Sequence, residues 1–414
     1  MTSDNIGSDP GDANGDVVRV HEPLTDLLAD GVFPHNDPFG LYADLRAAGP
    51  LSWNAPGGFW VAPCHREVTT VGADAVTWCS GKGILTFEIG AEYPTPPTMM
   101  HTDPPAHTRY RSLVQPAFGR RVVRALAPTI NAAATALVDR LPTNEPVDAV
   151  AQLAAVLPVH VIGMVLGLPE SDWDRVWAWS EATIPGTDTH NDPELRNTLR
   201  DEMAAELTRL IAAARITPGD DVISQLVSAE IGGDRLTDDE LAMFCNQLLV
   251  AGNETTRNTI SGALVAFADN PDEWTRLLDD RALVDSACEE ILRWTTPVIA
   301  FMRTATRDTT LAGVPIVAGD PVLMLYASAN RDELEFGPDA DQFRIDRSPN
   351  HHVAFGFGPH FCLGAALARA EITAIINALA DAGVTRFELT GPVGHSPSTI
   401  IAGITTAPMI LHTR

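Results

Sequence analysis

The chain has little positive charge. Its 414 residues include 28 lysines and arginines against 54 aspartates and glutamates, which gives a formal net charge of -26. A surface this acidic repels nucleic acid and anionic lipid, so DNA binding is excluded as a function. Hydrophobic residues make up 45% and charged residues 20% of the chain, which is the profile of a soluble globular protein with a large core.

Cysteine is scarce and scattered. The cysteines are Cys64, Cys79, Cys245, Cys288 and Cys362. Because none of them forms a Cys-x-x-Cys pair, the sequence excludes a disulfide scaffold and a thiolate zinc site. Four of these residues are expected to be thiols without a chemical role. Cys362 differs from them because of the residues that surround it.

A long uninterrupted hydrophobic run is also absent. The most apolar window, residues 151–168, contains Gln152 and Pro158, which would bury polar groups without partners in a membrane. A pair of core helices is expected there instead. The first 20 residues, rich in Asp, Gly and Asn, are interpreted as a disordered leader and not as a secretory signal. We therefore expect a cytoplasmic protein without a membrane span.

The pattern along the chain is mostly helical. From about Arg120 to Asp280 the sequence is rich in Ala, Leu, Arg and Glu, which is typical of helices. Beyond Arg303, short β-branched runs separated by glycines predict a small sheet, and Phe59–Ala62 predicts a further strand. No repeat or linker divides the rest of the chain. We expect one large domain over residues 21–414, mainly α with a minor β part.

The most informative segment is the glycine-rich stretch around Cys362. Residues 355–364 read Phe-Gly-Phe-Gly-Pro-His-Phe-Cys-Leu-Gly, and helix-forming residues follow. A thiolate that binds iron needs backbone N–H donors, a tight loop and a nearby positive potential. Gly356, Gly358 and Gly364 are expected to supply unusual backbone angles, and the helix N-terminus favours negative charge. The spacing favours a functional thiolate over a structural cysteine.

This segment resembles the haem-binding loop of the cytochrome P-450 family. The resemblance implies a helix-rich cytochrome P-450-type fold, haem b (iron protoporphyrin IX) as cofactor, and Cys362 as the axial ligand of the iron. It also implies that Phe355 packs near the sulfur and tunes the iron, and that His360 binds a haem propionate. Gly364 belongs to the same cofactor-binding loop.

A long helix is predicted to begin at a capping box, Thr237-Asp-Asp-Glu240, and to end at about Asp269. Its middle reads Ala-Gly-Asn-Glu-Thr-Thr from Ala251, which places polar residues in an otherwise apolar stretch. Gly252 is expected to let a flat molecule approach the helix backbone. The alternative is a solvated kink with threonine hydroxyls bonded to the preceding turn.

The same six residues resemble the oxygen-activation motif of the cytochrome P-450 family. The resemblance implies that Ala251 lies at the haem and that Thr255 stabilises the activated oxygen. Glu254 would then relay solvent protons so that the O–O bond breaks heterolytically.

Basic residues near two other motifs are candidates for haem binding. His107 and Arg111 are four residues apart and share one face of a helix, which Asp103 is expected to cap and Pro104 or Pro105 to begin. Two cations on one face usually point to solvent. The resemblance implies instead that both bind haem propionates and that Arg303 is a third ligand of these carboxylates.

Glu290 and Arg293 form a Glu-x-x-Arg motif with both side chains on one helix face. Such a pair on its own is usually a surface salt bridge of little value. The resemblance implies a buried structural pair that a third residue, Arg347, completes.

The implied activity is the insertion of one atom of O₂ into a C–H bond of a lipophilic small molecule. Since no flavin or dinucleotide fingerprint occurs in the sequence, the electrons are expected from a ferredoxin with its own reductase. Likeness to actinobacterial members favours a steroid, terpenoid or branched-lipid substrate. The resemblance implies a pocket lined by residues 83–87, 250–251, 299–301 and 399–401, all without charge, although Glu88 lies close by.

Docking of an acidic ferredoxin needs a local basic patch. Arg120, Arg121 and Arg124 are the candidates, and the alternative is an ordinary solvated helix start. We expect a monomer.

Three other functions remain as alternatives. One is a peroxide-driven haem-thiolate enzyme, which would not need Glu254 and Thr255. Another is a non-catalytic haem-binding sensor. The third is a metal hydrolase built on His351, His352 and His360, which lacks a matching ligand helix.

Overall fold

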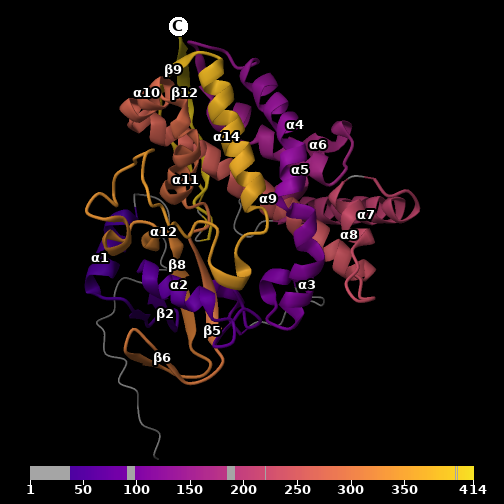
Figure 1. Cartoon of the computed structure of the whole chain (residues 1–414), viewed down its shortest axis with the longest axis vertical. Coiled ribbons are helices and arrows are strands. Elements are labelled where there is room, and N and C mark those ends of the chain that lie inside the picture. Colours follow the sequence, from indigo (N-terminus) through magenta and orange to yellow (C-terminus); the bar gives the residue numbers. More distant parts are fainter. Residues whose placement is uncertain (1–37, 91–97, 184–191, 220, 397, 399) are drawn as a thin grey trace, which may run out of the picture.

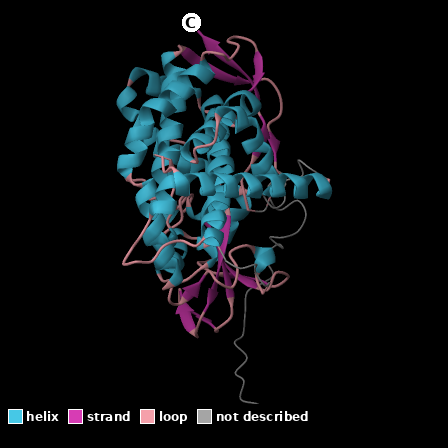
Figure 2. Cartoon of the chain, turned by 90° about the vertical axis from the view of Figure 1, so that its right-hand side faces the viewer, coloured by secondary structure: helices cyan, strands magenta, loops and turns pink. Residues whose placement is uncertain are grey.

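A computed structural model describes residues 38–90, 98–183, 192–219, 221–396, 398 and 400–414. A body of helices separates two small groups of strands, as Figure 2 shows. This architecture confirms the predicted fold class, mainly α with a minor β part. The expected leader over residues 1–20 and Thr399 of the expected pocket lining lie outside the described residues.

The helical body is formed by nine helices of seven residues or more from the described part of the chain after residue 119. They are α4 (Arg120–Val138), α5 (Val156–Val165), α6 (Trp173–Thr183), α7 (Pro193–Ile216), α8 (Val222–Ser228), α9 (Asp238–Asp269), α10 (Pro271–Asp279), α11 (Val284–Thr295) and α14 (Ala365–Asp381). Shorter or peripheral helices are α1 (Phe39–Ala48), α2 (His65–Ala73), α3 (Ala106–Val114), α12 (Tyr326–Ala329) and α13 (Glu333–Phe336).

The larger sheet has the strand order β1-β2-β8-β5-β3. Its strands are β1 (Ser52–Asn54), β2 (Phe59–Ala62), β3 (Trp78–Cys79), β5 (Ala300–Ala305) and β8 (Pro321–Leu325). Strands β2 and β8 pair in parallel, and the other pairs are antiparallel. The predicted strand over residues 59–62 is confirmed. In Figure 1 this sheet lies at the end of the molecule opposite to β9 and β12.

The remaining strands form three small groups. The strands are β4 (Pro146–Asp148), β6 (Thr309–Leu311), β7 (Val314–Ile316), β9 (Val384–Leu389), β10 (Gly394–His395), β11 (Ile404–Thr406) and β12 (Pro408–Thr413). Strand β4 interrupts the stretch that the sequence predicted to be helical nearly throughout. The helical pattern ends here because Pro146 cannot continue a helix. Residues 146–148 pair instead with the edge of β12.

Helix α9 begins as predicted, at a reciprocal capping box. The Glu240 N–H donates to the Thr237 hydroxyl at 3.2 Å, and the Thr237 N–H donates to the Glu240 carboxylate at 2.8 Å. The helix is then continuous to Asp269, and the solvated kink stays an alternative prediction. Its threonine hydroxyls do donate to carbonyls one turn earlier, as that alternative also required: Thr255 to Ala251 at 2.9 Å.

Gly252 makes room for a neighbouring helix. A Cβ at this position would lie 3.1 Å from Cδ1 of Ile162 in α5, closer than ordinary van der Waals contact. The missing side chain therefore serves the packing of α5 on α9. The expectation that Gly252 admits a flat molecule is wrong, because the space beside its Cα is filled by Ile162.

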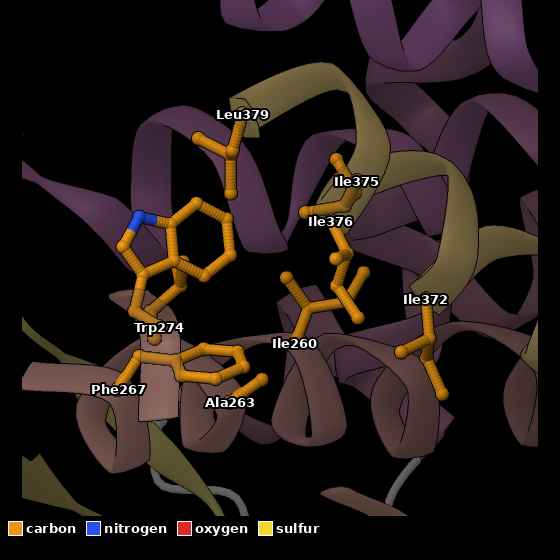
Figure 3. Close-up of a pocket in the computed structure, with 9 residues that line it drawn as sticks. Ile260, Ala263, Phe267, Trp274, Ile372, Ile375, Ile376 and Leu379 are labelled. Carbon is orange, nitrogen blue, oxygen red and sulfur yellow. The ribbon is translucent and has the colours of Figure 1, made fainter. Parts of the chain in front are cut away.

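Helices α9 and α14 pack through apolar side chains that leave one small cavity. Figure 3 shows it between Ile260 and Phe267 of α9 and Ile372 and Leu379 of α14. The cavity is about 10 Å³ and has no polar lining, so it stays dry and is a packing void rather than a binding site. This contact holds the helix that follows Cys362 against the helix that carries Thr255.

The apolar window over residues 151–168 is buried in the core, as expected. A π-helical turn (Val150–Ala154) leads into α5, whose Leu157 and Ile162 are buried. Across the described residues, no helix combines the length and the apolar character that crossing a bilayer requires.

Candidate functional site

Backbone hydrogen bonds close the loop before Cys362, and two of its glycines are required. The Cys362 N–H donates to the Phe355 carbonyl at 2.9 Å. Gly356 and Gly358 have φ of 70° and 72°, a region that side chains other than glycine rarely adopt. A Cβ at Gly358 would lie 2.2 Å from the carbonyl oxygen of Gly72 in α2. The loop can therefore pack on α2 only with glycine at position 358.

Gly364 has a different role from the one expected. Its φ is −83°, and a Cβ there would meet nothing within 4 Å, so the expectation of an unusual angle is wrong at this position. Gly364 is the N-cap of α14, and its N–H and that of Ala365 face the Cys362 sulfur as hydrogen-bond donors. The sulfur is thus at a helix N-terminus, as predicted.

Cys362 is accessible to solvent although it lies deep within the protein. Burial raises the pKa of its thiol. The N–H groups of Gly364 and Ala365 and the guanidinium groups of Arg111 and Arg369 act in the opposite direction. These four groups are the donors and the positive potential that a metal-bound thiolate needs once the metal has replaced the proton.

Phe355 and Arg369 form a second layer around the sulfur. The Arg369 guanidinium lies 4.7 Å from the centre of the Phe355 ring. The centres of the Phe355 and Phe361 rings are 5.9 Å apart. Arg369 also pairs with Glu289 at 2.6 Å. Sequence reasoning missed Arg369. Its signal was its position seven residues after Cys362, about one turn into the helix that follows the cysteine loop.

Four basic groups meet beside the cysteine loop: His107, Arg111, Arg303 and His360, here called the basic cluster. The rings of His107 and His360 lie 4.1 Å apart between centroids. Arg111 donates to the carbonyl of Phe361 at 2.7 Å, and Arg303 donates to the carbonyl of Met302 at 2.7 Å. Residues from α3, β5 and the cysteine loop are thus brought together as the sequence predicted.

Negative charge does not balance the basic cluster, in which His107 and Arg303 are buried and Arg111 and His360 are half-buried. Burial, and then the charges of Arg303, His107 and Arg111, lower the pKa of His360 to about 2. Burial and then Arg111 lower the pKa of His107, whose Nε2 has no hydrogen-bond partner. Such a group of donors fits a ligand that carries two carboxylates, as a haem does.

Asp103 does not cap helix α3. Its carboxylate accepts the N–H groups of Ser80 at 2.7 Å and Gly81 at 2.9 Å, and α3 begins three residues later, at Ala106. The expected cap is therefore wrong, since the side chain turns back to the strand β3 segment. Ser80, which sequence reasoning missed, places its hydroxyl 3.2 Å from Nε2 of His360.

Ala251, Glu254 and Thr255 lie in the middle of α9. Ala251 is exposed and Thr255 half-buried, one turn apart on the same face. Glu254 is buried, and its carboxylate lies 3.4 Å from the Arg257 guanidinium. The helix therefore presents a hydroxyl beside an accessible backbone carbonyl, with a carboxylate adjacent in sequence and already in an ion pair.

The Glu-x-x-Arg pair is buried, not a surface salt bridge. The side chains of Glu290 and Arg293 are both 0% exposed, and their two hydrogen bonds measure 2.7 and 2.8 Å. Arg347 donates to the same carboxylate at 3.2 Å. The prediction that Arg347 completes this network is confirmed.

The segments expected to line a pocket lie close to one another. The Ile84 carbonyl accepts the Met302 N–H at 2.7 Å, and the Ile299 N–H donates to Ile400 at 2.8 Å. Ile84 and Ile299 are buried, whereas Phe87 is 59% exposed. Backbone hydrogen bonds thus join the loop after β3 to β5, and the residue before β5 to the C-terminal segment.

The three histidines of the metal-hydrolase alternative have separate partners. His351 lies 3.1 Å from Glu335, His352 lies 3.1 Å from Glu289, and His360 belongs to the basic cluster. Within the described ranges no group of three or more His, Cys, Asp or Glu side chains could hold a metal ion. That alternative is unsupported.

A helical body, a thiolate loop at a helix N-terminus and a basic cluster define a haem-thiolate protein. Residues 194–402 match the family model described as cytochrome P450. A steroid C26-monooxygenase from Mycolicibacterium smegmatis is 38% identical over 395 residues, which cover 94% of this chain and 96% of that protein.

Two solved structures are similar over 91% of this chain. A cytochrome P450 from Chondromyces apiculatus has a TM-score of 0.83 at 32% identity, with 96% of that chain covered. A cytochrome P450 from Bacillus megaterium in complex with corticosterone has a TM-score of 0.82 at 31% identity, with 99% of that chain covered. The chain belongs to the cytochrome P450 family. It is a haem-thiolate monooxygenase, with haem b as its cofactor.

Proposed function

We propose that the sulfur of Cys362 would hold the haem iron and that the enzyme oxidises a C–H bond of a steroid-like lipophilic substrate. The observation that carries this proposal is the position of the sulfur. It is accessible at the start of α14, within reach of the N–H groups of Gly364 and Ala365, and next to the basic cluster. The bound haem supplies the oxygen-activating chemistry, while the protein holds the haem, excludes water and delivers protons.

The carbon monoxide difference spectrum of the reduced protein tests the ligand. The wild-type protein is expected to show the Soret band of thiolate ligation, and Cys362→Ala to lose both this band and turnover. Cys288→Ala is the control, because Cys288 is a buried thiol packed between α11 and α14. A normal spectrum with full turnover in Cys362→Ala would show the assignment to be wrong.

The basic cluster is proposed to bind the haem propionates. His107, Arg111, Arg303 and His360 supply charge-assisted hydrogen bonds to the two carboxylates, and these carboxylates offset the repulsion within the cluster. Ala251, Phe355 and Gly364 complete the cofactor-binding set, on α9 and in the cysteine loop. The unpartnered Nε2 of His107 supports this proposal, because buried polar atoms of native proteins are rarely left without a hydrogen bond.

Thr255 and Glu254 are proposed to be the catalytic residues. The Thr255 hydroxyl donates its proton to the Ala251 carbonyl, so its oxygen lone pairs are free to accept a hydrogen bond from an incoming proton donor. Glu254 lies within the protein and pairs with Arg257. A relay through Glu254 requires its carboxylate to alternate between this ion pair and solvent.

The substrate is proposed to be a steroid. The relative from Mycolicibacterium smegmatis is named for oxidation of C26, a carbon of the sterol side chain, and the Bacillus megaterium structure holds corticosterone. The exposed ring of Phe87, in the loop that follows the buried Ile84, is an apolar group that such a ligand could cover. Cholesterol, corticosterone and a small polar alcohol can be compared by the change that each causes in the haem spectrum. A response to the polar alcohol alone would contradict the proposal.

Electrons are proposed to come from a ferredoxin that docks on the exposed side chains of Arg120, Arg121 and Arg124 at the start of α4. Helix α4 packs on α14, the helix that follows the cysteine loop, which supports a docking site on this part of the protein. Reversal of these three charges is expected to slow electron transfer and to reduce its salt dependence. An unchanged rate and salt dependence would contradict the docking site.

The cellular context completes the proposal. We infer a monomeric enzyme of the cytoplasm with one catalytic domain over residues 21–414. The absence of a spanning helix among the described residues and the net charge of -26 are compatible with this setting.

A further inference from the structure

Glu88 binds the backbone of its own loop. Its Oε2 accepts the N–H groups of Ile84 and Leu85, both at 3.0 Å, and the same oxygen lies 3.1 Å from Nε2 of His101. The Glu88 side chain is 13% exposed and that of His101 12%. A carboxylate without partners beside a lipophilic pocket would disfavour binding of an apolar ligand. The Glu88 carboxylate instead binds three donors, the N–H groups of Ile84 and Leu85 and the His101 ring.

His101 is itself held in one orientation. Its Nδ1 lies 2.7 Å from the hydroxyl of Thr98, so the ring presents Nε2 to Glu88. His101 ends the short helix Met99–His101, which precedes α3 with its haem-site residues His107 and Arg111. The Glu88–His101 pair therefore joins the apolar loop at residues 83–87 to the segment that leads into α3.

The loop is also tied to the basic cluster through β5. The Ile84 carbonyl accepts the Met302 N–H at 2.7 Å, and the Met302 carbonyl accepts Nη1 of Arg303 at 2.7 Å. Ile84, Met302 and Arg303 are all buried. Hydrogen bonds and the backbone between them thus connect Glu88, through Ile84 and Met302, to Arg303.

We propose that Glu88, with His101 as its partner, is a positioning residue that fixes the wall of the substrate pocket formed by residues 84–87. This inference rests on the proposed function, because it takes that loop to contact the substrate. Glu88 does not touch the substrate. It holds the backbone of Ile84 and Leu85 so that the apolar side chains of the loop, including the exposed Phe87, meet a lipophilic molecule without first being ordered by it.

Two substitutions separate the contributions of the carboxylate. Glu88→Ala removes both the hydrogen bonds to the loop and the hydrogen bond with His101. Glu88→Gln keeps a carbonyl oxygen for the N–H groups of Ile84 and Leu85 but removes the charge. Glu273→Ala is the matched control: this carboxylate is 14% exposed, pairs with Arg276 at 2.6 Å and accepts the Ile345 N–H at 2.9 Å.

Hydrogen–deuterium exchange of the holoenzyme is the first measurement. Glu88→Ala is expected to raise exchange of the amides at residues 83–88 and to leave those of α9 and α14 unchanged, whereas Glu273→Ala leaves the loop protected. Glu88→Gln is expected to give an intermediate increase. Unchanged exchange of the loop in Glu88→Ala would overturn the inference, whatever the substrate is.

Corticosterone binding, followed by the haem spectrum, is the second measurement. Glu88→Ala is expected to raise the dissociation constant about tenfold and Glu88→Gln about threefold, with KM rising and kcat retained. Haem content and the carbon monoxide spectrum stay at wild-type values, which a general loss of structure would not allow. An unchanged dissociation constant in Glu88→Ala overturns the inference.

The outcomes also separate this inference from the proposed function. If the wild-type spectrum shows thiolate ligation but does not respond to corticosterone or cholesterol, the steroid proposal fails and hydrogen exchange alone decides the role of Glu88. If Glu88→Ala loses haem or does not fold, Glu88→Gln decides by the same two measurements.

Discussion

The sulfur side and the substrate side of the haem site are built in opposite ways. On the sulfur side, one segment of ten residues, 355–364, supplies Cys362, its loop glycines and His360, and backbone hydrogen bonds fix it. On the proposed substrate side, the surface would come from short pieces at residues 84–87, 251–255, 299–301 and 400–401. The comparison teaches that the chemistry common to a family is encoded locally, whereas its selectivity is assembled from distant segments.

The largest effect is expected from the buried network behind the sulfur side. Glu290 accepts hydrogen bonds from Arg293, Arg347 and Asn350 and from the N–H of Arg344. Glu290→Gln leaves the buried Arg293 guanidinium without a counter-charge and leaves Arg347 only its pair with Asp339, so it should cost about 3–5 kcal/mol of unfolding free energy. Thermal or urea unfolding of the purified protein measures this, and Glu333→Gln is the control, because the Glu333 side chain is 53% exposed in its pair with Arg46.

A stability loss of equal size in Glu290→Gln and Glu333→Gln would mean that the buried network is no more important than a surface ion pair. The contrast between the rigid sulfur side and the adaptable substrate side would then lose its energetic basis.

The next effect concerns two glycines of one loop. Gly358→Ala should destabilise the protein by about 2–3 kcal/mol, because its φ is 72° and the new Cβ would collide with the carbonyl of Gly72. Gly364→Ala should change stability by no more than about 0.5 kcal/mol, since its φ is −83° and the space is open. Urea unfolding curves of both variants measure the difference, and equal midpoints would contradict it.

This pair of glycines also shows how far sequence reasoning reaches. The motif identified the cysteine loop and its chemistry, because the residues that carry them are contiguous. It could not distinguish Gly358 from Gly364, since the difference depends on Gly72 of α2, which lies nearly 300 residues away in the sequence. The need for glycine at position 358 depends on a tertiary contact, and the spacing of residues in the motif carries no information about that contact.

The same limit applies to charged side chains. The helix spacing placed His107 and Arg111 on one face, but only the family resemblance made them candidates for haem binding. The turn of Asp103 toward Ser80, and that of Glu88 toward His101, could not be predicted, because a carboxylate bonds whichever N–H groups the tertiary fold brings near it. Arg347 was found only because the family resemblance supplied its partner.

A third effect, on coupling and not on stability, is expected at Thr255. Thr255→Ala removes the hydroxyl proposed to accept the incoming proton, so product formed per reductant consumed should fall about tenfold to a hundredfold. Thr255→Ser, which keeps a hydroxyl, should retain most of the product formed per reductant consumed. Thr259→Ala is the matched control, because the Thr259 hydroxyl makes the same bond one turn later, to the Thr255 carbonyl at 2.8 Å. Equal losses in Thr255→Ala and Thr259→Ala would assign the effect to helix geometry.

The smallest effect is expected on the substrate side, at Phe87. This ring is 59% exposed and therefore contributes little to the free energy of unfolding. A bound lipophilic ligand would cover it. Phe87→Ala should weaken corticosterone binding about threefold and leave haem content, the carbon monoxide spectrum and unfolding unchanged. Leu334→Ala, at a residue that is 94% exposed in α13, is the control and should alter none of these. If Phe87→Ala instead reduced haem content as strongly as substitutions in the cysteine loop, the substrate side would be as tightly coupled to the cofactor as the sulfur side, and selectivity could not be changed there without loss of the haem.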